Sequence, residues 1–181
     1  MKNRAVFLDR DGTLIEEKAY LKDPGQVVFF SDGPQALKKL QNSGFKLFLV
    51  TNQSGVGRGF FTLADVDKVH GRLASELARH GVKFEKVYVA PEHPDRPSCG
   101  RKPSPEFLFD ARDEFNLDLA QSYMIGDKLI DLECGWNAGV KKSILVRTGY
   151  GKEVERRDAK KIGDAMIVNT LRHAADWILE R

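Results

Sequence analysis

Carboxylates suited to metal and phosphate chemistry follow two short apolar runs of the chain. Asp9 and Asp11 stand two apart, directly after the run at residues 5–8. Side chains two apart on an extended segment point to the same side, so these two carboxylates would repel each other. Asp127 closely follows a second run, at residues 123–125. Three such groups at one place need a cation at neutral pH, and a small set of oxygen ligands suits hydrated Mg²⁺.

A hydroxyl and an ammonium could complete such a site. Thr51 follows the run at residues 47–50, and Lys102 follows the run at 87–90 at a short distance. Donors of these kinds stabilise the oxygens of a transferring phosphoryl group. A carboxylate can itself be the nucleophile while a second one serves as acid and then as base. One Asp-x-Asp pair in a loop is more often a solvated turn, but polar groups of the required types after four predicted strands indicate a phosphate site.

The apolar runs predict the elements that position these groups. Runs rich in Val, Ile, Leu and Phe predict buried strands at residues 5–8, 47–50, 87–90, 123–125 and 144–146. Segments of helical period lie between them, with start and stop signals such as Thr62 and Gly139. This alternation predicts an α/β fold with a doubly wound parallel sheet, which binds ligands beyond the carboxyl ends of its strands. No linker or repeat divides residues 1–181, so we expect a single domain.

Composition narrows the classes of partner. The 181 residues are 41% hydrophobic, and 29 Lys and Arg nearly balance 26 Asp and Glu. The densest basic segment, residues 152–161, is interrupted by acidic residues and indicates a solvated helix face, so no nucleic acid is expected. Two cysteines form no disulfide framework. We find no signal peptide and no apolar stretch of about 20 residues, and expect a cytoplasmic monomer without a membrane partner.

Four segments carry a resemblance to a known family. FLDRDGT, LVTNQSG, GRKPSP and MIGDKLID resemble, in order and spacing, the motifs of the haloacid dehalogenase superfamily of aspartate-nucleophile phosphatases. The resemblance implies that Asp9 is the nucleophile and a Mg²⁺ ligand. It implies that Asp11 is the general acid and base, with its backbone carbonyl on the metal, and that Asp127 completes the metal shell. The core would be Rossmann-like.

The same resemblance gives roles to the remaining polar groups. Thr51 and Lys102 would stabilise the phosphoryl group, and Asp131 would orient Lys102 or a bound water. The stretches between the motifs are taken up by expected helices and strands, so there is no room for a cap domain. The site is therefore predicted to be open, with access governed by short loops.

A longer string, TNQSGVGRG, narrows the resemblance to the D-glycero-D-manno-heptose-1,7-bisphosphate phosphatases and the related histidinol-phosphate phosphatases. A guanidinium offers a bidentate fork, which suits a second phosphate. For Arg58, a substrate-binding role and a simple surface position after a glycine-rich turn fit the sequence equally well. By this resemblance a small sugar phosphate would be held by Glu17, Tyr20, Asn52, Gln53, Ser54, Arg58, Arg101 and Lys128.

One feature of that subfamily is missing. Many members carry a zinc loop before the RKP motif, with a Cys-x-His pair and then a Cys-x-Cys pair. Only His93 and Cys99 remain nearby in this chain, and two donors cannot form a closed tetrahedral site. We therefore expect Mg²⁺ as cofactor and no zinc. The places of the four zinc ligands hold Ala90, Glu92, Ser98 and Gly100.

The expected activity is Mg²⁺-dependent hydrolysis of the 7-phosphate of the heptose bisphosphate through an aspartyl-phosphate. A histidinol-phosphate phosphatase, or another small phosphomonoesterase, is an open alternative. Two hypotheses from other classes are a receiver-like phosphoacceptor and a non-catalytic sugar-phosphate binding module. The receiver would need its phosphoacceptor on a later strand, and a binding module would not need a complete nucleophile, acid and metal set.

Overall fold

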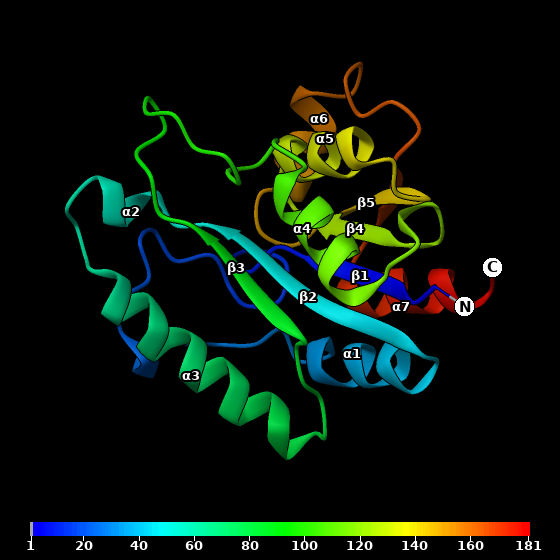
Figure 1. The fold of residues 1–181 in the computed structure, drawn as a ribbon, viewed down its shortest axis with the longest axis horizontal. Coiled ribbons are helices and arrows are strands. Elements are labelled where there is room, and N and C mark those ends of the chain that lie inside the picture. Colours follow the sequence, from blue (N-terminus) through cyan, green and yellow to red (C-terminus); the bar gives the residue numbers. More distant parts are fainter. Residues whose placement is uncertain (1) are drawn as a thin grey trace.

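The computed structural model describes residues 2–181, which form a parallel sheet between two layers of helices (Figure 1). Its six strands lie in the order β3-β2-β1-β4-β5-β6. This order, with a crossover between β1 and β4, is that of a doubly wound sheet and confirms the predicted fold class. The strands are β1 (Arg4–Leu8), β2 (Phe45–Asn52), β3 (Lys86–Ala90), β4 (Tyr123–Gly126), β5 (Lys142–Val146) and β6 (Met166–Val168).

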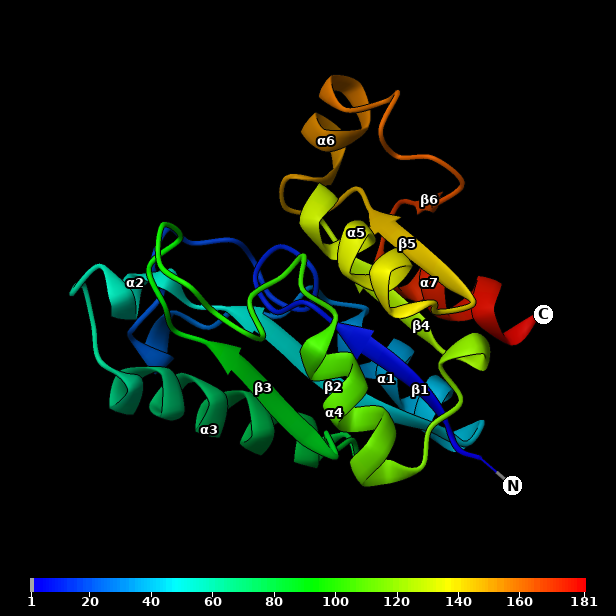
Figure 2. The same ribbon diagram turned by 45° about the horizontal axis from the view of Figure 1, so that its top comes forward.

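Helices cover both faces of the sheet (Figures 1 and 2). Helices α1, α3 and α7 pack on one face, and α4 and α5 pack on the other. The α-helices are α1 (Gly33–Asn42), α2 (Ser54–Gly57), α3 (Leu63–Arg79), α4 (Glu106–Phe115), α5 (Leu129–Ala138), α6 (Gly151–Arg157) and α7 (Leu171–Leu179). Two short 3-10 turns, η1 (Pro24–Gln26) and η2 (Leu119–Gln121), lie in connections.

The central strand β1 shows why its sequence is a continuous apolar run. Val6 and Leu8 pack into the core on the side of α1 and α7, whereas Ala5 and Phe7 pack into the core on the side of α4 and α5. All four side chains are fully buried. Because successive residues of a strand face opposite sides, a strand covered on both faces needs apolar residues at every position.

The structure extends several predicted elements. Strand β2 continues through Thr51 and Asn52, which pair with Val89 and Ala90 of β3, so these two polar residues end the strand rather than follow it. The sequence predicts that this strand ends at Val50, because the run of apolar residues ends there. Strand β6 and helices α2 and α7 were not predicted.

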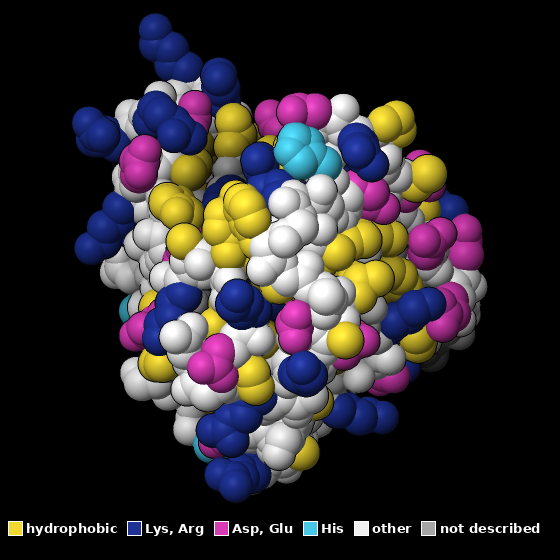
Figure 3. Space-filling model, turned by 90° about the vertical axis from the view of Figure 1, so that its left-hand side faces the viewer, with side chains coloured by type: hydrophobic (Ala, Val, Ile, Leu, Met, Phe, Trp, Pro, Cys, Tyr) yellow, Lys and Arg dark blue, Asp and Glu magenta, His cyan; other side chains and the backbone are white. Residues whose placement is uncertain are grey.

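The edge of the sheet to which the strands point carries loops and no inserted domain among residues 2–181. The connection from β1 to α1 contains only the turn η1, and the one from β3 to α4 has no helix or strand. Figure 3, which faces this side, shows basic and acidic side chains interspersed. Among the described residues, no helix is both long enough and apolar enough to cross a membrane.

Candidate active site

Three buried carboxylates meet where β1 and β4 end. Asp9 follows β1, Asp127 follows β4, and Asp131 lies in the first turns of α5. One oxygen of each lies within 4.8 Å of the others. The three carboxylates gather beyond the ends of β1 and β4, the two strands at the crossover point, where doubly wound sheets place their ligands. Their mutual repulsion must be balanced by positive charge.

Lys102 supplies part of that charge. Its Nζ donates to Oδ1 of Asp9 at 2.7 Å and to the carbonyl of Val50 at 2.8 Å, and it lies 2.6 Å from Oδ1 of Asp131. Burial opposes the charged form of Lys102, but the charges of Asp131 and Asp9 outweigh burial and raise the pKa of this ammonium. Lys102 is therefore a permanent cation with three acceptors around it.

Asp127 retains a free oxygen. Its Oδ2 accepts a hydrogen bond from the backbone N–H of Tyr150 at 2.8 Å, while the buried Oδ1 has no hydrogen-bond partner among residues 2–181. Burial, and then the charge of Asp9, raise the pKa of Asp127 to about 8. Gly12 has φ +83°, and a Cβ there would overlap Oδ2 of Asp127. A larger residue at position 12 would displace the carboxylate.

The donor set fits a divalent oxygen-seeking cation. Asp127 offers an unpartnered buried oxygen, and Asp9 lies beside it with one oxygen on Lys102. Asp131 is less available, because Lys102 and the backbone N–H of Lys128 both bond to its carboxylate. Carboxylates and carbonyls in small number are typical of Mg²⁺ sites that keep several waters. The geometry thus places Asp9 and Asp127 where they could hold the ion, while the metal-binding role of the Asp11 carbonyl stays a prediction.

Asp11 lies at the border between the carboxylate cluster and a pocket. Its Oδ2 accepts hydrogen bonds from Nε2 of Gln53 at 3.0 Å and from Nε of Arg10 at 3.0 Å. The same Nε2 of Gln53 donates to Oγ1 of Thr51 at 2.8 Å, which fixes the orientation of the hydroxyl. The side chain of Asp11 is 14% exposed, whereas that of Arg10 is 1% exposed.

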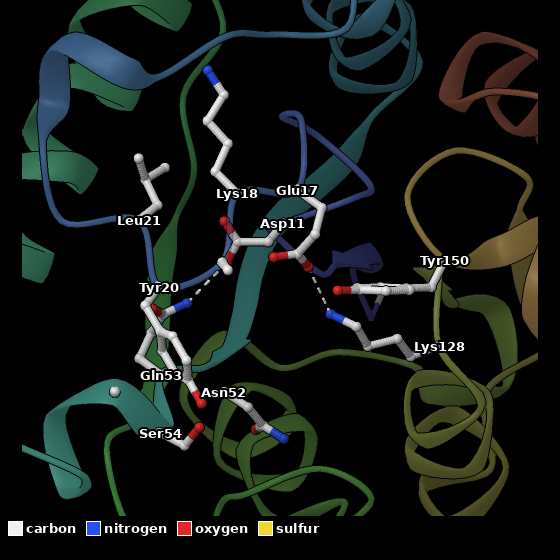
Figure 4. Close-up of a pocket in the computed structure, with 12 residues that line it drawn as sticks. Asp11, Glu17, Lys18, Tyr20, Leu21, Asn52, Gln53, Ser54, Lys128 and Tyr150 are labelled. Atoms are coloured by element: carbon white, nitrogen blue, oxygen red, sulfur yellow. Dashed lines mark hydrogen bonds and ion pairs between the residues drawn. The ribbon is translucent and has the colours of Figure 1, made fainter. Parts of the chain in front are cut away.

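The pocket beside Asp11 has a volume of about 360 Å³ and a polar lining (Figure 4). Nζ of Lys128 bonds to Oε2 of Glu17 at 3.0 Å and lies 4.9 Å from the centre of the Tyr150 ring. Figure 4 shows this group facing Gln53 and Ser54 across the pocket. The lining consists of Asp11, Glu17, Lys18, Ala19, Tyr20, Leu21, Asn52, Gln53, Ser54, Gly55, Lys128 and Tyr150.

Two predicted substrate-binding arginines lie outside that lining. Arg58 is exposed at the end of α2. Arg101 is partly buried, and its NH1 atom has no hydrogen-bond partner among residues 2–181. Burial lowers the pKa of Arg101, and the charge of Arg58 lowers it further, whereas Glu92 raises it. The two guanidiniums are thus near each other, and their roles stay predictions.

The loop before Lys102 is held together by hydrogen bonds. Oγ of Ser98 donates to Oε2 of Glu92 at 2.8 Å and accepts from the backbone N–H of Arg101 at 3.2 Å. Nδ1 of His93 accepts from the backbone N–H of Asp95. Among residues 2–181, only the Asp9, Asp127 and Asp131 cluster gathers three metal-ligating side chains. The expected lack of zinc stays a prediction.

Sequence reasoning missed three contributors to the site. Arg10 reads as a solvated residue between two aspartates, yet it is fully buried. His70, which Arg10 contacts, lies on α3 and carries no motif. Tyr150 contributes a backbone N–H, a group that every residue except proline possesses. The place of Arg10 in the sequence, between Asp9 and Asp11, was the one available signal.

Comparison with known proteins identifies the relatives of the chain. Residues 99–174 match the family model described as HAD-hydrolase-like. D-glycero-β-D-manno-heptose-1,7-bisphosphate 7-phosphatase of Yersinia pestis is 37% identical, over 97% of this chain and 89% of that protein. The D-glycero-D-manno-heptose-1,7-bisphosphate 7-phosphatase of Chlorobaculum tepidum is 38% identical, over 83% and 81%.

A solved structure agrees with these relatives. The D,D-heptose 1,7-bisphosphate phosphatase from B. bronchiseptica, complexed with magnesium and phosphate, superposes with a TM-score of 0.89. The two sequences are 28% identical, and the match covers 98% of each chain. The resemblance inferred from the four motifs is confirmed by relatives that span nearly the whole chain. The chain therefore belongs to the haloacid dehalogenase-like hydrolases and is a phosphatase.

Proposed function

We propose that this phosphatase removes the 7-phosphate of D-glycero-D-manno-heptose 1,7-bisphosphate. The observation that carries the proposal is the polar pocket of about 360 Å³ that opens directly beside Asp11. A sugar needs hydrogen-bonding groups along its length, and Glu17, Asn52 and Ser54 supply them. The relatives that are 37% and 38% identical are both named as 7-phosphatases of this compound.

Phosphoryl transfer to the protein is the first step. Oδ1 of Asp9 is held by Lys102, so we assign the attack on phosphorus to Oδ2. As this oxygen bonds to phosphorus, the bond from phosphorus to the sugar oxygen breaks, and Asp11 gives its proton to that oxygen. Lys102 and Thr51 stabilise the negative charge on the phosphoryl oxygens. The products are an aspartyl-phosphate and the free sugar hydroxyl.

Hydrolysis of the aspartyl-phosphate is the second step. Asp11, now ionised, takes a proton from a water molecule, and the oxygen of that water attacks phosphorus. The bond from phosphorus to Asp9 breaks, which releases inorganic phosphate and restores the carboxylate of Asp9 and the protonated carboxyl of Asp11. Mg²⁺ would be held by Asp9, Asp127 and the carbonyl of Asp11, and it would supply charge neutralisation for the phosphoryl group.

The proposal extends to the metal ion, the oligomeric state and the cellular compartment. We propose Mg²⁺ without zinc, on the ground that the places of the zinc ligands hold residues such as Ala90 and Gly100. We also propose that the chain acts as a monomer of one domain in the cytoplasm. Nothing in the described site calls for a group from a second copy.

Phosphate release by the purified enzyme tests the substrate. The panel contains the heptose 1,7-bisphosphate, histidinol phosphate and several sugar monophosphates, each with Mg²⁺ and with excess EDTA. ³¹P NMR of the product shows which phosphate has left. We expect the largest kcat/KM for the bisphosphate, loss of the 7-phosphate with the 1-phosphate retained, and no turnover in EDTA.

The Asp9→Asn protein serves as the matched control for contaminating phosphatases. A larger kcat/KM for histidinol phosphate would assign the chain to that activity instead. Release of the 1-phosphate would overturn the proposal that the enzyme removes the 7-phosphate. Binding of the bisphosphate without any turnover would leave only a binding module.

A further inference from the structure

A buried arginine and a histidine lie behind the Asp11 carboxylate. Arg10 approaches Oδ2 of Asp11 with two nitrogens, Nε at 3.0 Å and NH2 at 2.9 Å. Its third nitrogen, NH1, lies 3.2 Å from Nε2 of His70, which belongs to α3. The contact joins residues 60 positions apart in the chain and links the loop after β1 to the long helix.

The chemistry of this contact fixes the state of His70. A guanidinium can only donate, so Nε2 must accept and the imidazole must be neutral with its proton on Nδ1. Burial, and then the charge of Arg10, lower the pKa of His70 to about 4. His70 therefore stays an acceptor at neutral pH.

Full burial of Arg10 needs a reason. Its side chain is 1% exposed, and Asp11 is its only carboxylate partner among the described residues. Replacing a buried ion pair by apolar side chains is often neutral or stabilising, so stability alone does not account for a guanidinium here. Its planar fork, by contrast, fixes the orientation of the carboxylate that it contacts.

The donors also decide where Asp11 can carry a proton. Nε and NH2 of Arg10 and Nε2 of Gln53 point at Oδ2, while the buried Oδ1 has no hydrogen-bond partner among residues 2–181. A proton on Oδ2 would compete with these N–H donors. Only Oδ1 has lone pairs left for it.

We propose that Arg10, oriented by His70, is a positioning residue that holds Asp11 so that Oδ1 is the oxygen that gives the proton to the leaving group. The inference rests on the proposed function of Asp11 as general acid. It goes further, because it names Oδ1 as the proton-donating atom and adds Arg10 and His70, two residues that do not touch the substrate.

Leaving groups of different basicity test this role. The departing p-nitrophenolate needs no proton, whereas a sugar alkoxide does, so a misplaced general acid slows only the second class strongly. kcat/KM reports the steps up to and including the first phosphoryl transfer, from the substrate to Asp9. We would measure it for p-nitrophenyl phosphate and for the best primary alkyl phosphate of a panel, whichever sugar that substrate carries.

Matched pairs of variants separate positioning from folding. Arg10→Met removes the fork, and Arg10→Lys retains the charge. His70→Leu removes the acceptor, and His70→Gln restores one. His80→Leu, at the exposed end of the same helix, is the control, and thermal melting of each protein checks the fold.

We expect Arg10→Met to lower kcat/KM for the alkyl phosphate by roughly 10²-fold or more and for p-nitrophenyl phosphate by less than about tenfold. His70→Leu should change the ratio in the same direction by a smaller factor, and His70→Gln should restore it. Equal losses on both substrates, or an unchanged ratio, would overturn the proposal. The identity of the best sugar substrate reports on the proposed function separately.

Discussion

Nζ of Lys102 lies 2.7 Å from Oδ1 of Asp9, although 93 residues separate the two in the sequence. The contact brings the loop before α4 to the end of β1 and supplies a buried cation among three buried carboxylates. The ammonium is fully used, because Val50 and Asp131 take its other bonds. The same group therefore stabilises the fold and balances charge at the nucleophile.

Replacing Lys102 by methionine tests both roles. The change leaves the carboxylates of Asp9 and Asp131 buried without their cation, and breaking a buried ion pair typically costs about 3–5 kcal/mol. Turnover should fall by about 10²–10³-fold, as when a donor to a developing charge is lost. Urea unfolding and kcat measure the two effects. A variant as stable as the wild type would contradict the claim that Lys102 stabilises the buried carboxylates of Asp9 and Asp131.

Asp9→Asn should abolish turnover while the protein remains folded. The amide is not a nucleophile, and uncatalysed phosphomonoester hydrolysis is among the slowest reactions known, so no neighbouring group can substitute. Removing one of three repelling carboxylates should leave the melting temperature in EDTA unchanged or raised. Rapid quenching followed by mass spectrometry should find a phosphorylated wild-type chain and none for the variant. Residual activity above about a tenth would exclude Asp9 as nucleophile.

Much of this site was predictable because the carboxyl ends of parallel strands lie at one edge of the sheet, where ligands bind. Apolar runs located five of the strands, and the polar residues after them include Asp9, Asp127 and Lys102. Strand β6 escaped prediction because it has only three residues and its side chains are half-buried. Strand β2 ends at Asn52 because pairing with β3, rather than side-chain polarity, sets its length.

Contacts between distant elements were not predictable. The pairing of Arg10 with His70 depends on how α3 lies against the loop after β1, and a single sequence does not encode that placement in any local pattern. The same holds for the backbone N–H of Tyr150, which reaches Asp127 through the turn after β5. Residue type indicated the chemistry, whereas the packing of helices on the sheet determined the partners.

The raised pKa of Asp127 makes stability depend on pH. In the unfolded chain this carboxyl loses its proton near pH 4, whereas in the folded, metal-free protein it keeps the proton until about pH 8. The folded state thus binds an extra proton between these values, and stability falls as pH rises. His70 acts in the opposite sense, but only between its ordinary pKa of 6.5 and its lowered pKa of about 4.

The range from pH 6.5 to pH 8.5 therefore covers the titration of Asp127 and lies above that of His70. In EDTA the melting temperature should fall across this range, and added Mg²⁺ should raise it more at pH 8.5 than at pH 6.5, because the ion replaces the lost proton. Asp127→Asn should remove both trends. Scanning calorimetry of the two proteins provides the data, and a Mg²⁺ effect of equal size at both pH values would argue against a metal at this carboxylate.

Glu17→Gln should weaken substrate binding more than catalysis. Glu17 holds Lys128 at the pocket wall with an ion pair of 3.0 Å, and both side chains are partly exposed. Loss of such a pair releases the ammonium but does not touch Asp9 or Asp11. KM for the bisphosphate should rise about fivefold while kcat stays within a factor of about two, since partly exposed pairs contribute about 1 kcal/mol. The neighbouring exposed change Glu16→Gln is the control, and an equal effect there would remove the pocket role of Glu17.

The purified protein should contain no stoichiometric zinc and should stay folded in chelator, although chelator stops catalysis. Hydrogen bonds from Ser98 to Glu92 and from Arg101 to Ser98 close the loop in which the resemblance would place zinc ligands. A structural zinc contributes on the order of 10 kcal/mol to folding, so a true site would make the loop sensitive to chelator. Metal analysis after growth with added zinc, together with proteolysis of the loop in EDTA, measures this. One zinc per chain, lost together with loop order in a Cys99→Ser variant, would show that a metal closes the loop.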